Sequence, residues 1–573
     1  MIYLNRRLRH HYYSLLTVNF LSMTRAARRF WEILPGATTW SILLMPFVMS
    51  FVWPVGVAYF IILFDVYWLV KALVMGGHLV FGYMHMQRAM KIDWLARLHE
   101  TENLEAFANR LFRQFYLAKW FEARKLRDEW EQVEKIRVLP AAQKHWKEVV
   151  HAVIFAVYKE SYEVVEASVR SCFESNYPKN KILIVLALEG RAGEPAQEVA
   201  RRIQEKFAGA FMDILVSVHP DGIVGEMKAK GANVYQAGKV LQKYTDEHGI
   251  AYDNVVVSCF DADTLASRQY FANVTYNYIL TPERTFRSYQ PIPLFNNNIW
   301  DVPAINRLVA FGSSYWQMIE STRPYRLVNF SSQAMSLKTL VDIDFWDRSV
   351  VSEDSKQFYR AYYHYNGNHK VIPIFTPVSM DAVLGKTYWE TLKAQYIQKR
   401  RWAWGIEHFP YAVEKFFTTR NQMTWYQRII HPFRMLEGHV SWASSSLLIA
   451  LGGWLPILMN IDFRSSILAY HLPVLARDLL SITWIGVVIS TMISLKLIPA
   501  RPKKYGKMRA LEMILQWVLV PISGIIFGSI PAIDAETRLM LGKYLGFHVT
   551  DKERKTVFDP SAVDKTVVSK VTV

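Results

Sequence analysis

The sequence predicts an α/β domain with a mostly parallel sheet, joined on both sides to membrane-spanning α-helices. Short, β-rich apolar runs such as "VIFAV" from Val153 and "ILIVLAL" from Ile182 alternate with helical stretches such as "YEVVEASVRSCF". Alternation of strand and helix is typical of a parallel sheet covered on both faces. Long, almost uncharged apolar runs lie before and after this region. A run of roughly 18 residues or more indicates a helix that crosses a bilayer.

Composition limits the alternatives without choosing a function. The chain has 573 residues, of which 51% are hydrophobic, so it can form more than one core. Its net charge of +17 suits nucleic acid, an anionic membrane surface or an anionic substrate. The only two cysteines, Cys172 and Cys259, lie in apolar segments, which excludes a disulfide framework and a cysteine-rich metal site. No helix-turn-helix, zinc-finger or RNA-binding signature is present, so we expect no nucleic acid partner.

The amino-terminal region is predicted to enter and leave the membrane once. Residues 1–37 form a basic segment, and residues 38–84 form two transmembrane helices that separate near Trp53-Pro54. The positive-inside rule places residues 1–37 in the cytoplasm, and the helical hairpin returns the chain to that side. Residues 85–147 are rich in charge and are predicted to form surface helices. The arginines before the first span are Arg6, Arg7, Arg9, Arg25, Arg28 and Arg29.

The carboxyl-terminal region contains further apolar runs, at residues 440–459, 479–498 and 510–533. They predict an interfacial helix and three or four transmembrane helices within residues 429–533, followed by a tail at residues 534–573. The basic loop "RPKKYGK" is expected on the cytoplasmic side. The chain is therefore predicted to be an integral protein of the cell (inner) membrane, surrounded by membrane lipids, with a cytoplasmic domain at residues 148–428.

One apolar run leads directly into two carboxylates. "NVVVSCF" is followed by "DADT", so Asp261 and Asp263 emerge at the end of a predicted strand. Ligands of such sheets bind at the carboxyl ends of the strands, and two hard oxygen donors there suit Mg²⁺ or Mn²⁺ holding a diphosphate. Asp342 and Asp344 have the same spacing but do not follow an apolar strand. We therefore predict a structural role for that second pair.

Three further motifs follow the same order as in a known family. They are "EMKAKGAN" from Glu226, "VVSEDS" from Val350 and "QKRRW" from Gln398. Together with "DADT", they make the chain resemble the membrane-bound family-2 glycosyltransferases, the group that contains cellulose, chitin and hyaluronan synthases and ceramide glucosyltransferase. The resemblance covers roughly residues 150–405 and the flanking spans. It implies that residues 148–428 form a Rossmann-like GT-A glycosyltransferase domain in the cytoplasm.

The resemblance assigns roles to the matching residues. In that family, a lysine-rich element ending in asparagine lines the nucleotide pocket, and an Asp-x-Asp binds the metal and diphosphate. A Glu-Asp pair supplies the general base, and a Gln-x-x-Arg-Trp helix completes the acceptor end. Many relatives have an aspartate where this chain has Glu189, which is a candidate contact for the nucleotide base or ribose. The matching positions are Lys228, Lys230 and Asn233; Asp261 and Asp263; Glu353 and Asp354; and Gln398, Arg401 and Trp402.

Helical spacing gives "QKRRW" a physical role. If the segment is helical, Gln398, Arg401 and Trp402 share one face, because residues three and four apart are neighbours. The guanidinium can pair with a diphosphate, and the indole offers a flat apolar platform to a sugar ring. Lys399 and Arg400 are predicted to point elsewhere, toward lipid headgroups or water.

The resemblance implies sugar transfer from a nucleotide diphosphate donor, expected to be a UDP-sugar, to a polysaccharide or lipid acceptor at the membrane. Asp354 is the predicted general base, because the attacking hydroxyl must lose its proton. A cation at Asp261 and Asp263, helped by Arg401, is expected to stabilise the leaving diphosphate. No second carboxylate is evident as a nucleophile, so inversion is expected. The alternative is a non-catalytic membrane protein that binds anionic ligands through basic patches; the sequence identifies no accessory subunits.

The side of the carboxyl-terminal tail is ambiguous. "FHVTDK" at residues 547–552 resembles the Phe-x-Val-Thr-x-Lys loop that cellulose synthases keep on the cytoplasmic side, over the donor pocket. Two spans before the domain and three after it would instead place the tail outside. Either residues 510–533, interrupted by proline and glycine, do not cross completely, or residues 465–480 contain another span. We predict a cytoplasmic tail.

Overall fold

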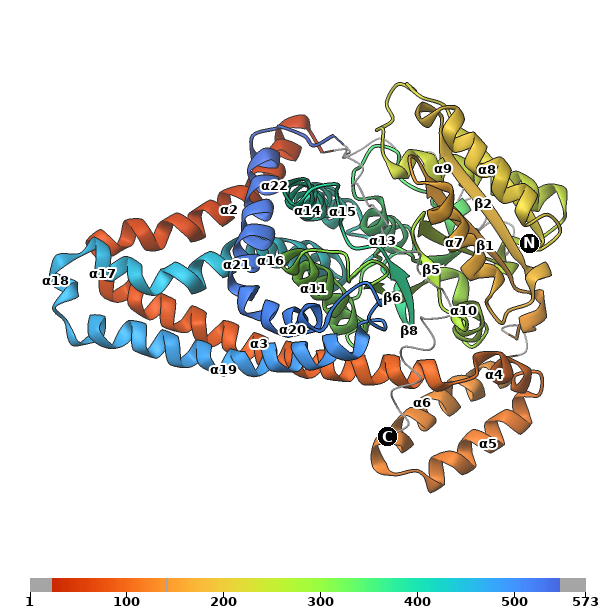
Figure 1. Ribbon diagram of the computed structural model, residues 1–573, viewed down its shortest axis with the longest axis horizontal. Helices are drawn as coiled ribbons and strands as arrows, with labels where there is room; N and C mark the ends of the chain where they lie inside the picture. Colours follow the sequence, from red (N-terminus) through yellow and green to blue (C-terminus); the bar gives the residue numbers. More distant parts are fainter. Residues whose placement is uncertain (1–22, 140–142, 547–573) are drawn as a thin grey trace.

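The computed structural model describes residues 23–139 and 143–546. An α/β domain lies at one end, and a bundle of long helices extends away from it (Figure 1). Arg6, Arg7 and Arg9 and the segment 547–552, which the sequence analysis used, lie outside the described residues.

An eight-stranded sheet forms the centre of the α/β domain, in the order β3-β2-β1-β4-β7-β6-β8-β5. The four apolar runs that predicted strands are its first four strands, and they pair in parallel as expected. The other half is mixed, because β7 is antiparallel to β4 and β6, and β5 is antiparallel to β8. The strands are β1 (Val150–Val157), β2 (Ile182–Glu189), β3 (Asp213–His219), β4 (Val255–Asp261), β5 (Leu265–Ala266), β6 (Arg287–Phe295), β7 (Ala334–Ser336) and β8 (Lys370–Met380).

The reversed strand β7 matters for the site. Since β7 is antiparallel to β4, its first residue, Ala334, pairs with Ser258 in the middle of β4. The residues before Ala334 run toward the carboxyl end of β4, where the Gln333 carbonyl accepts from the backbone N–H of Cys259. The loop before β7 therefore lies beside Asp261, the last residue of β4. The sequence predicted a mostly parallel sheet and did not identify this antiparallel strand, which brings the loop to that edge.

Helices cover both faces of the sheet because side chains alternate along each strand. On one face, Val153 and Phe155 of β1 share a core with α7 (Tyr162–Phe173), α8 (Glu194–Lys206) and α10 (Tyr270–Ile279). On the other face, Ala152 and Ile154 pack with α9 (Lys230–Glu247) and α12 (Leu337–Asp342). This two-sided cover agrees with the predicted α/β class.

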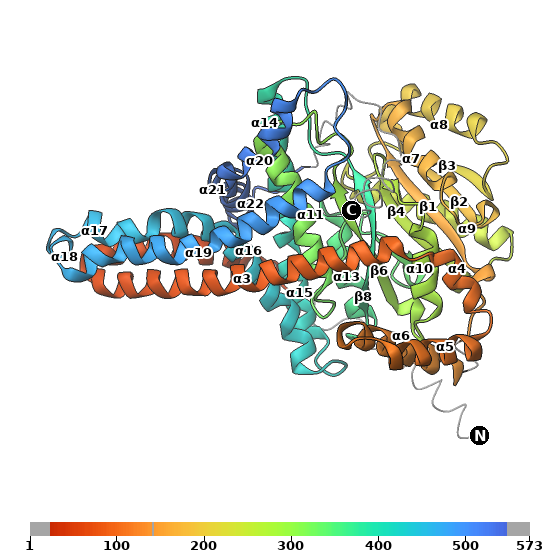
Figure 2. The same ribbon diagram turned by 60° about the horizontal axis from the view of Figure 1, so that its bottom comes forward.

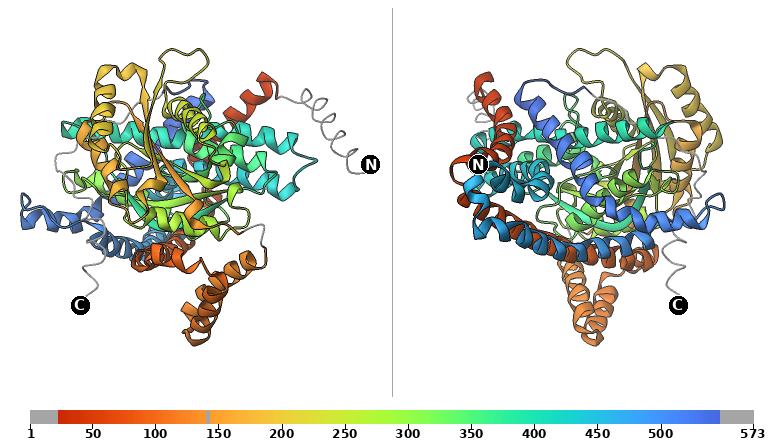
Figure 3. Two further views of the ribbon diagram at one scale, coloured as in Figure 1. Left: turned by 90° about the vertical axis from the view of Figure 1, so that its right-hand side faces the viewer. Right: turned by 60° about the vertical axis from the view of Figure 1, so that its left-hand side comes forward.

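Residues 94–137 form helices, as their charge pattern predicted. The three helices are α4 (Trp94–Glu100), α5 (Leu104–Leu117) and α6 (Trp120–Arg137). They are more than a solvated surface, because Phe107 and Leu111 join the same core as α10. Figure 3 shows α5 and α6 projecting from the domain as a hairpin.

Five helical segments are long and apolar enough to cross a membrane: Arg25–Val52, Pro54–Lys91, Trp425–Met459, Ile467–Leu497 and Lys507–Met540. The first two, α2 and α3, separate at Trp53, where a break was predicted. Residues 465–480, a candidate extra span, are instead mostly the first half of α19 (Ile467–Leu497). α3 packs along α19, and α2 packs along α16 (Trp425–Leu451). Figure 2 shows these helices side by side, leading away from the sheet.

The last of these segments differs from the other four. It is broken into α20 (Lys507–Leu515), a 3₁₀ turn (Gln516–Leu519), α21 (Val520–Gly524), a π-helical turn (Ile525–Ser529) and α22 (Ile530–Met540). Near its start, Glu512 pairs with Arg307 of α11 (Ala304–Ser321) at 2.8 Å. Near its end, Asp534 pairs with Arg400 of α14 (Tyr388–Ala403) at 2.9 Å. Both ends thus contact the α/β domain, and α21 and α22 run across the bundle in Figure 1.

Candidate active site

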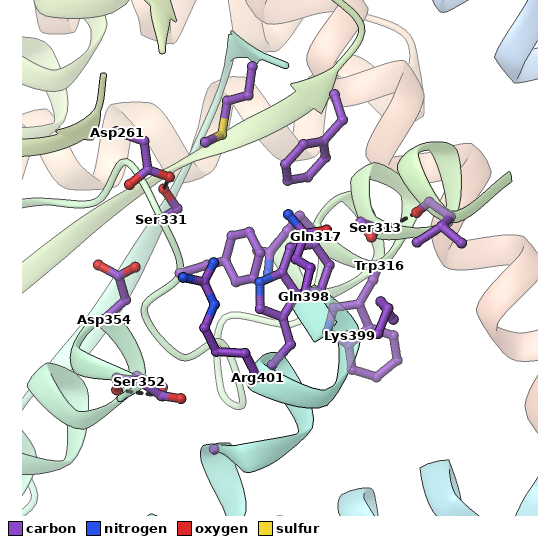
Figure 4. A pocket seen from close by; sticks show the side chains of 18 of the residues that line it. Asp261, Ser313, Trp316, Gln317, Ser331, Ser352, Asp354, Gln398, Lys399 and Arg401 are labelled. Atoms are coloured by element: carbon purple, nitrogen blue, oxygen red, sulfur yellow. Dashed lines mark hydrogen bonds between the residues drawn. The ribbon is translucent and has the colours of Figure 1, made fainter. Parts of the chain in front are cut away.

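A cavity of about 1530 Å³ connects the sheet with the helical bundle. Its lining begins at the carboxyl ends of β1, β2 and β4, continues along α11 and α14, and ends between α3, α16, α19 and α21. Asp261, Asp263, Asp354 and Trp402 all line it, so one cavity joins the predicted donor and acceptor ends. Figure 4 shows part of this lining.

Lys230 holds three carboxylates together at the sheet end of the cavity. Its Nζ lies 2.7 Å from Asp261 Oδ1, 3.3 Å from Glu353 Oε1 and 3.7 Å from Asp354 Oδ2. Burial disfavours the charged amine, but Asp261, Asp354 and Glu353 outweigh burial and hold the pKa of Lys230 well above its usual value. Lys230 is therefore a permanent cation between the "DAD" and "SED" motifs.

The local sequence places this lysine. Lys230 is the first residue of α9, and the next residue is Gly231. A Cβ at Gly231 would lie 2.5 Å from the Asp347 carbonyl oxygen, so a side chain there would push α9 away from this segment. Glu353 and Asp354 begin α13 (Glu353–His364), where the helix dipole favours acidic side chains.

Asp354 has a carboxyl group suited to proton transfer near neutral pH. Burial raises the pKa of Asp354 to about 7, with Lys230 opposing the shift and Glu353 and Asp261 adding to it. Gln333, in the loop before β7, donates to Asp354 Oδ1 at 3.4 Å. A carboxyl group with a pKa near the working pH is an effective general base.

Asp261 and Asp263 can hold a divalent cation only together with further oxygen donors. Asp261 Oδ2 accepts from Ser331 Oγ at 2.9 Å, and Asp263 Oδ2 accepts from the backbone N–H of Asp381 at 2.9 Å. Among the described residues, no group of three or more His, Cys, Asp or Glu side chains could hold a metal by itself. Mg²⁺ usually takes one or two carboxylates and completes its shell with phosphates and water. The donor set therefore fits a cation that is bound jointly with a diphosphate.

The "QKRRW" segment is helical, as the spacing argument required. Gln398, Arg401 and Trp402 of α14 all line the cavity. Figure 4 shows Arg401 directed toward Asp261 and Asp354. Burial lowers the pKa of Arg401, and Glu353, Asp261 and Asp354 oppose that shift. The guanidinium therefore faces the same site as Lys230.

The indole of Trp402 is held in an aromatic cluster. Its ring centroid lies 6.0 Å from that of Phe295, at the end of β6, and 5.9 Å from that of Phe330. Gln398 accepts from Gln395 at 3.0 Å. These contacts fix the helix face that carries the three predicted residues.

Three predicted nucleotide-pocket residues lie at the edge of the cavity or outside it. Asn233 is buried and donates to the Ala187 carbonyl oxygen at 2.8 Å, so it supports β2 and does not line the cavity. Lys228 is mostly exposed, pairs with Asp221 at 2.7 Å and lines a small separate pocket. Glu189 does line the cavity and accepts from Arg191.

The second Asp-x-Asp copy has the structural role that was predicted. Asp342 accepts from Tyr365 Oη at 2.9 Å, and Asp344 pairs with Lys239 at 3.0 Å. Neither lines the cavity. Equal spacing thus has a different meaning away from a strand end.

Lys399 and Arg400 were predicted to point toward lipid headgroups or water, but neither lies on an open surface. Arg400 is paired with Asp534 of α22. Lys399 lines the cavity, with its Nζ 4.9 Å from the Trp402 ring centroid and 4.8 Å from that of Trp442 in α16. α16 and α22 cover the face of α14 that the sequence alone left open.

Sequence reasoning missed the residues that hold the "SED" segment. Glu407 Oε1 accepts from the backbone N–H groups of Val351 at 3.0 Å and Ser352 at 3.2 Å. His408 Nε2 lies 2.9 Å from the Ser352 carbonyl oxygen. Burial raises the pKa of Glu407 to about 7, although the hydrogen bonds from Ser352, Trp404 and Val351 and the charge of Lys356 oppose the shift. Glu407 follows "QKRRW" closely, but no motif marks it.

No protein-family model and no curated protein matches the sequence. Among solved structures, the mannosyltransferase PcManGT from Pyrobaculum calidifontis in complex with GDP-Man and Mn²⁺ is 15% identical, and the match covers 73% of this chain and 99% of that chain at a TM-score of 0.34. TarS 1–349 of S. aureus is 12% identical over 70% and 95% of the two chains at 0.31.

GalNAc-T7 with UDP, GalNAc and Mn²⁺ is 10% identical to the present chain, over 50% of this chain and 57% of that chain, at a TM-score of 0.29. By their descriptions, PcManGT is a mannosyltransferase with GDP-Man bound, and the GalNAc-T7 structure contains UDP and GalNAc. Likenesses with such low identities and TM-scores carry no argument about the activity of this chain.

Proposed function

We propose that the chain is a membrane glycosyltransferase that moves a sugar, with inversion, from a nucleotide diphosphate donor to an acceptor hydroxyl at the membrane. The single observation that carries the proposal is the shared cavity, which brings Lys230, Asp261, Asp354, Arg401 and Trp402 together. A decayed scaffold would not need a buried cation between three carboxylates. A UDP-sugar is the expected donor, on the strength of the motif resemblance alone.

The donor end is the sheet end. The diphosphate would lie beside Asp261, where the Lys230 ammonium and the Arg401 guanidinium supply fixed positive charge. A divalent cation held with the diphosphate at Asp261 and Asp263 would supply further neutralisation of the leaving group. Arg401 is directed toward Asp261 and Asp354 (Figure 4), and Lys230 pairs with both, so both cations would lie near the phosphates.

Asp354 is the proposed general base. The acceptor hydroxyl attacks the anomeric carbon, its proton passes to Asp354, and the bond to the diphosphate breaks with its electron pair on the leaving oxygen. Lys230 and Gln333 orient the Asp354 carboxylate. A one-step displacement of this kind inverts the anomeric carbon, and Glu353, which is engaged with Lys230, is not needed as a nucleophile.

The bundle suggests how the chain lies in the membrane. We place α2, α3, α16–α17 and α19 as four crossing helices, with the α/β domain on the cytoplasmic side because of the basic residues near α2. The segment 507–540 would lie along the inner boundary, since Glu512 and Asp534 at its two ends both pair with the α/β domain. Four crossings return the tail to the cytoplasm, which supports the predicted side.

The test uses purified full-length protein in vesicles and a panel of nucleotide sugars with Mg²⁺ or Mn²⁺. We expect nucleotide release from one donor, lost on chelation of the metal. Asp354→Asn should lower release about 10²–10⁴-fold while donor binding survives, because Lys230 and Arg401 remain. Asp344→Asn, in the structural Asp-x-Asp copy, should keep release within about twofold of wild type.

Two outcomes would reject the proposal. If no donor in the panel released its nucleotide, the alternative of a non-catalytic protein that binds anionic ligands through basic patches would be favoured. Undiminished release by Asp354→Asn would remove Asp354 as the base.

A further inference from the structure

The cavity has a second end, which sugar-donor chemistry does not explain. Beyond Trp402, its lining is formed by α3, α11, α16, α19 and α21. The lining residues nearest the far end of the bundle are Trp68 on α3 and Ser445 on α16. At 1.5 Å per residue, Trp68 lies about 21 Å from Pro54, and Ser445 a similar distance from Met459. The cavity therefore stops near the domain end of the bundle. In the proposed membrane placement, this is the depth of the inner leaflet.

The short reach of the cavity into the bundle argues against a growing polymer as the acceptor. A conduit for a growing polymer would need lining residues along the whole bundle, yet within the described part of the chain no residue of α2, α17 (Leu455–Met459) or α18 (Ile461–Arg464) lines this cavity. The cavity does reach the side of the bundle. Lys71 of α3 and Glu437 of α16 both line it, pair at 2.9 Å, and keep 26% and 33% of their side chains exposed. An acceptor could therefore enter from the leaflet between α3 and α16.

The end of the cavity beyond Trp402, which lies within the helical bundle, carries excess positive charge. Its acidic side chains are already engaged, since Glu320 pairs with Arg323 at 2.5 Å and with Arg326 at 3.2 Å, and Glu437 pairs with Lys71. Five basic side chains face two acidic ones, and Lys399 and Arg434 are the two that form no ion pair with these carboxylates. The lining residues with charge are Lys71, Arg323, Arg326, Lys399 and Arg434 against Glu320 and Glu437.

Lys399 is the most unusual of these cations. Its Nζ lies between the rings of Trp402 and Trp442, at 4.9 and 4.8 Å. Within the described residues, no carboxylate forms an ion pair with it. Burial, with no acidic neighbour to offset it, lowers the pKa of Lys399 to about 8. A cation held in this way is costly to the empty protein and is compensated when an anion binds beside it.

The relative positions of Lys399 and Asp354 indicate what kind of molecule carries the anion. Figure 4 shows Lys399 on the far side of Arg401 from Asp261 and Asp354. An anion at Lys399 would thus lie next to the Trp402 ring, whose centroid is 4.9 Å from Lys399 Nζ, and beyond Arg401 from the reacting centre. The ligand must therefore carry its charge between a hydroxyl-bearing head, which reaches Asp354, and a hydrophobic tail.

We propose that the acceptor is a membrane lipid whose phosphate binds at Lys399, whose hydroxylated head lies over Trp402 and whose chains leave between α3 and α16. This inference rests on the proposed sugar transfer. In the step, a head hydroxyl forms the new bond to the anomeric carbon, Asp354 takes the hydroxyl proton, and the nucleoside diphosphate leaves with the electron pair of the broken bond. The phosphate of the lipid stays intact and serves only to hold the acceptor.

The first experiment measures which lipids the full-length protein retains, without any donor. Protein in vesicles of phosphatidylcholine, phosphatidylglycerol and an alkyl glucoside is extracted, and bound lipid is counted by native mass spectrometry. We expect preferential retention of phosphatidylglycerol, which has both an anionic phosphate and head hydroxyls. Lys399→Met should weaken that retention about tenfold, the effect of one charge-assisted contact, whereas Lys399→Arg should keep it.

Lys393→Met is the matched control, because Lys393 is on the same helix, is exposed and does not line the cavity. It should retain lipid like wild type. Equal retention by Lys399→Met and wild type would overturn the proposal. So would equal retention of the alkyl glucoside, or displacement of the lipid by millimolar glycerol 3-phosphate, which would identify a soluble phosphate as the ligand.

A second measurement separates this inference from the proposed function. With donor added, phosphatidylglycerol or another phosphate-bearing lipid in the vesicles should gain the mass of one sugar. Asp354→Asn should abolish that gain while lipid retention stays at the wild-type level. Transfer to a soluble oligosaccharide, with no dependence on Lys399, would reject the lipid acceptor and keep the proposed glycosyltransferase activity. Lipid retention that depends on Lys399, without nucleotide release from any donor, would keep the lipid site and reject the glycosyltransferase activity.

Discussion

Lys230 and Lys399 line the same cavity, and each is removed from bulk water, but their surroundings are opposite. Lys230 lies among Asp261, Glu353 and Asp354, which hold its pKa well above the usual value against the effect of burial. Lys399 lies between two indoles, and burial lowers its pKa to about 8. The charge of Lys230 is balanced by carboxylates of the protein, whereas the charge of Lys399 has no such partner and is proposed to bind an anionic ligand. The two ends of the cavity therefore suit different partners.

The largest effect is expected at the balanced lysine. Lys230→Met would remove the cation that lies within 4 Å of all three carboxylates, which disfavours their charged forms and removes a donor to the diphosphate. We expect nucleotide release to fall about 100-fold or more, together with a lower thermal unfolding midpoint. Release is measured in vesicles, and unfolding is measured by tryptophan fluorescence of the purified protein.

Lys239→Met gives the matched comparison. Lys239 is on the same helix and also pairs with an aspartate, Asp344, but at the surface, where an ion pair contributes about 0–1 kcal/mol. Its release should stay within about twofold of wild type. If both lysine variants lost activity equally, the carboxylate cluster around Lys230 would have no special role.

The next largest effect is expected at Glu407, which holds the segment before Asp354. Glu407→Ala would free the backbone of Val351 and Ser352, which leads directly to Asp354. We expect kcat to fall about tenfold, from misplacement of the base, with little change in donor affinity. Glu407→Gln keeps the oxygen that accepts both N–H groups and should recover most of the rate. A parallel loss of donor affinity and kcat in Glu407→Ala would indicate general unfolding and not a positioning role.

The sequence was sufficient where the relevant contacts are local. The first four strands follow from short β-rich runs, and Asp261 follows from its place at a strand end. The shared face of Gln398, Arg401 and Trp402 follows from helical spacing. Each of these needed only residues close together in the chain.

The remaining features depend on distant segments. Trp442, which turns Lys399 from a surface residue into a cavity residue, comes from another helix. Lys228 and Lys230 are two residues apart, and only the start of α9 decides that Lys230 faces Asp261. Hydropathy recognises the length of the segment 507–540, but the ion pairs of Glu512 and Asp534 determine where its ends lie. Periodicity and motif spacing carry no information on such contacts.

The smallest effect is expected at Lys399, where the substitution should stabilise the protein and not weaken it. In detergent without anionic lipid, Lys399→Met should stabilise the protein by about 1–2 kcal/mol at pH 7, because the folded state no longer holds a desolvated charge. The folded pKa is about 8, and the unfolded value is about 10.4. Between these values the unfolded chain binds more protons, so wild-type stability gains with rising pH.

The advantage of Lys399→Met over wild type should therefore be full below pH 8 and shrink as the pH rises toward 10. Denaturant unfolding at pH 7, 8.5 and 9.5 measures it, with Lys393→Met showing no such trend because Lys393 is exposed. Added phosphatidylglycerol should reverse the order at pH 7, since only the wild type gains a bound phosphate. A Lys399→Met protein less stable than wild type at every pH would mean that the two indoles alone compensate the charge, and the contrast between the two lysines would disappear.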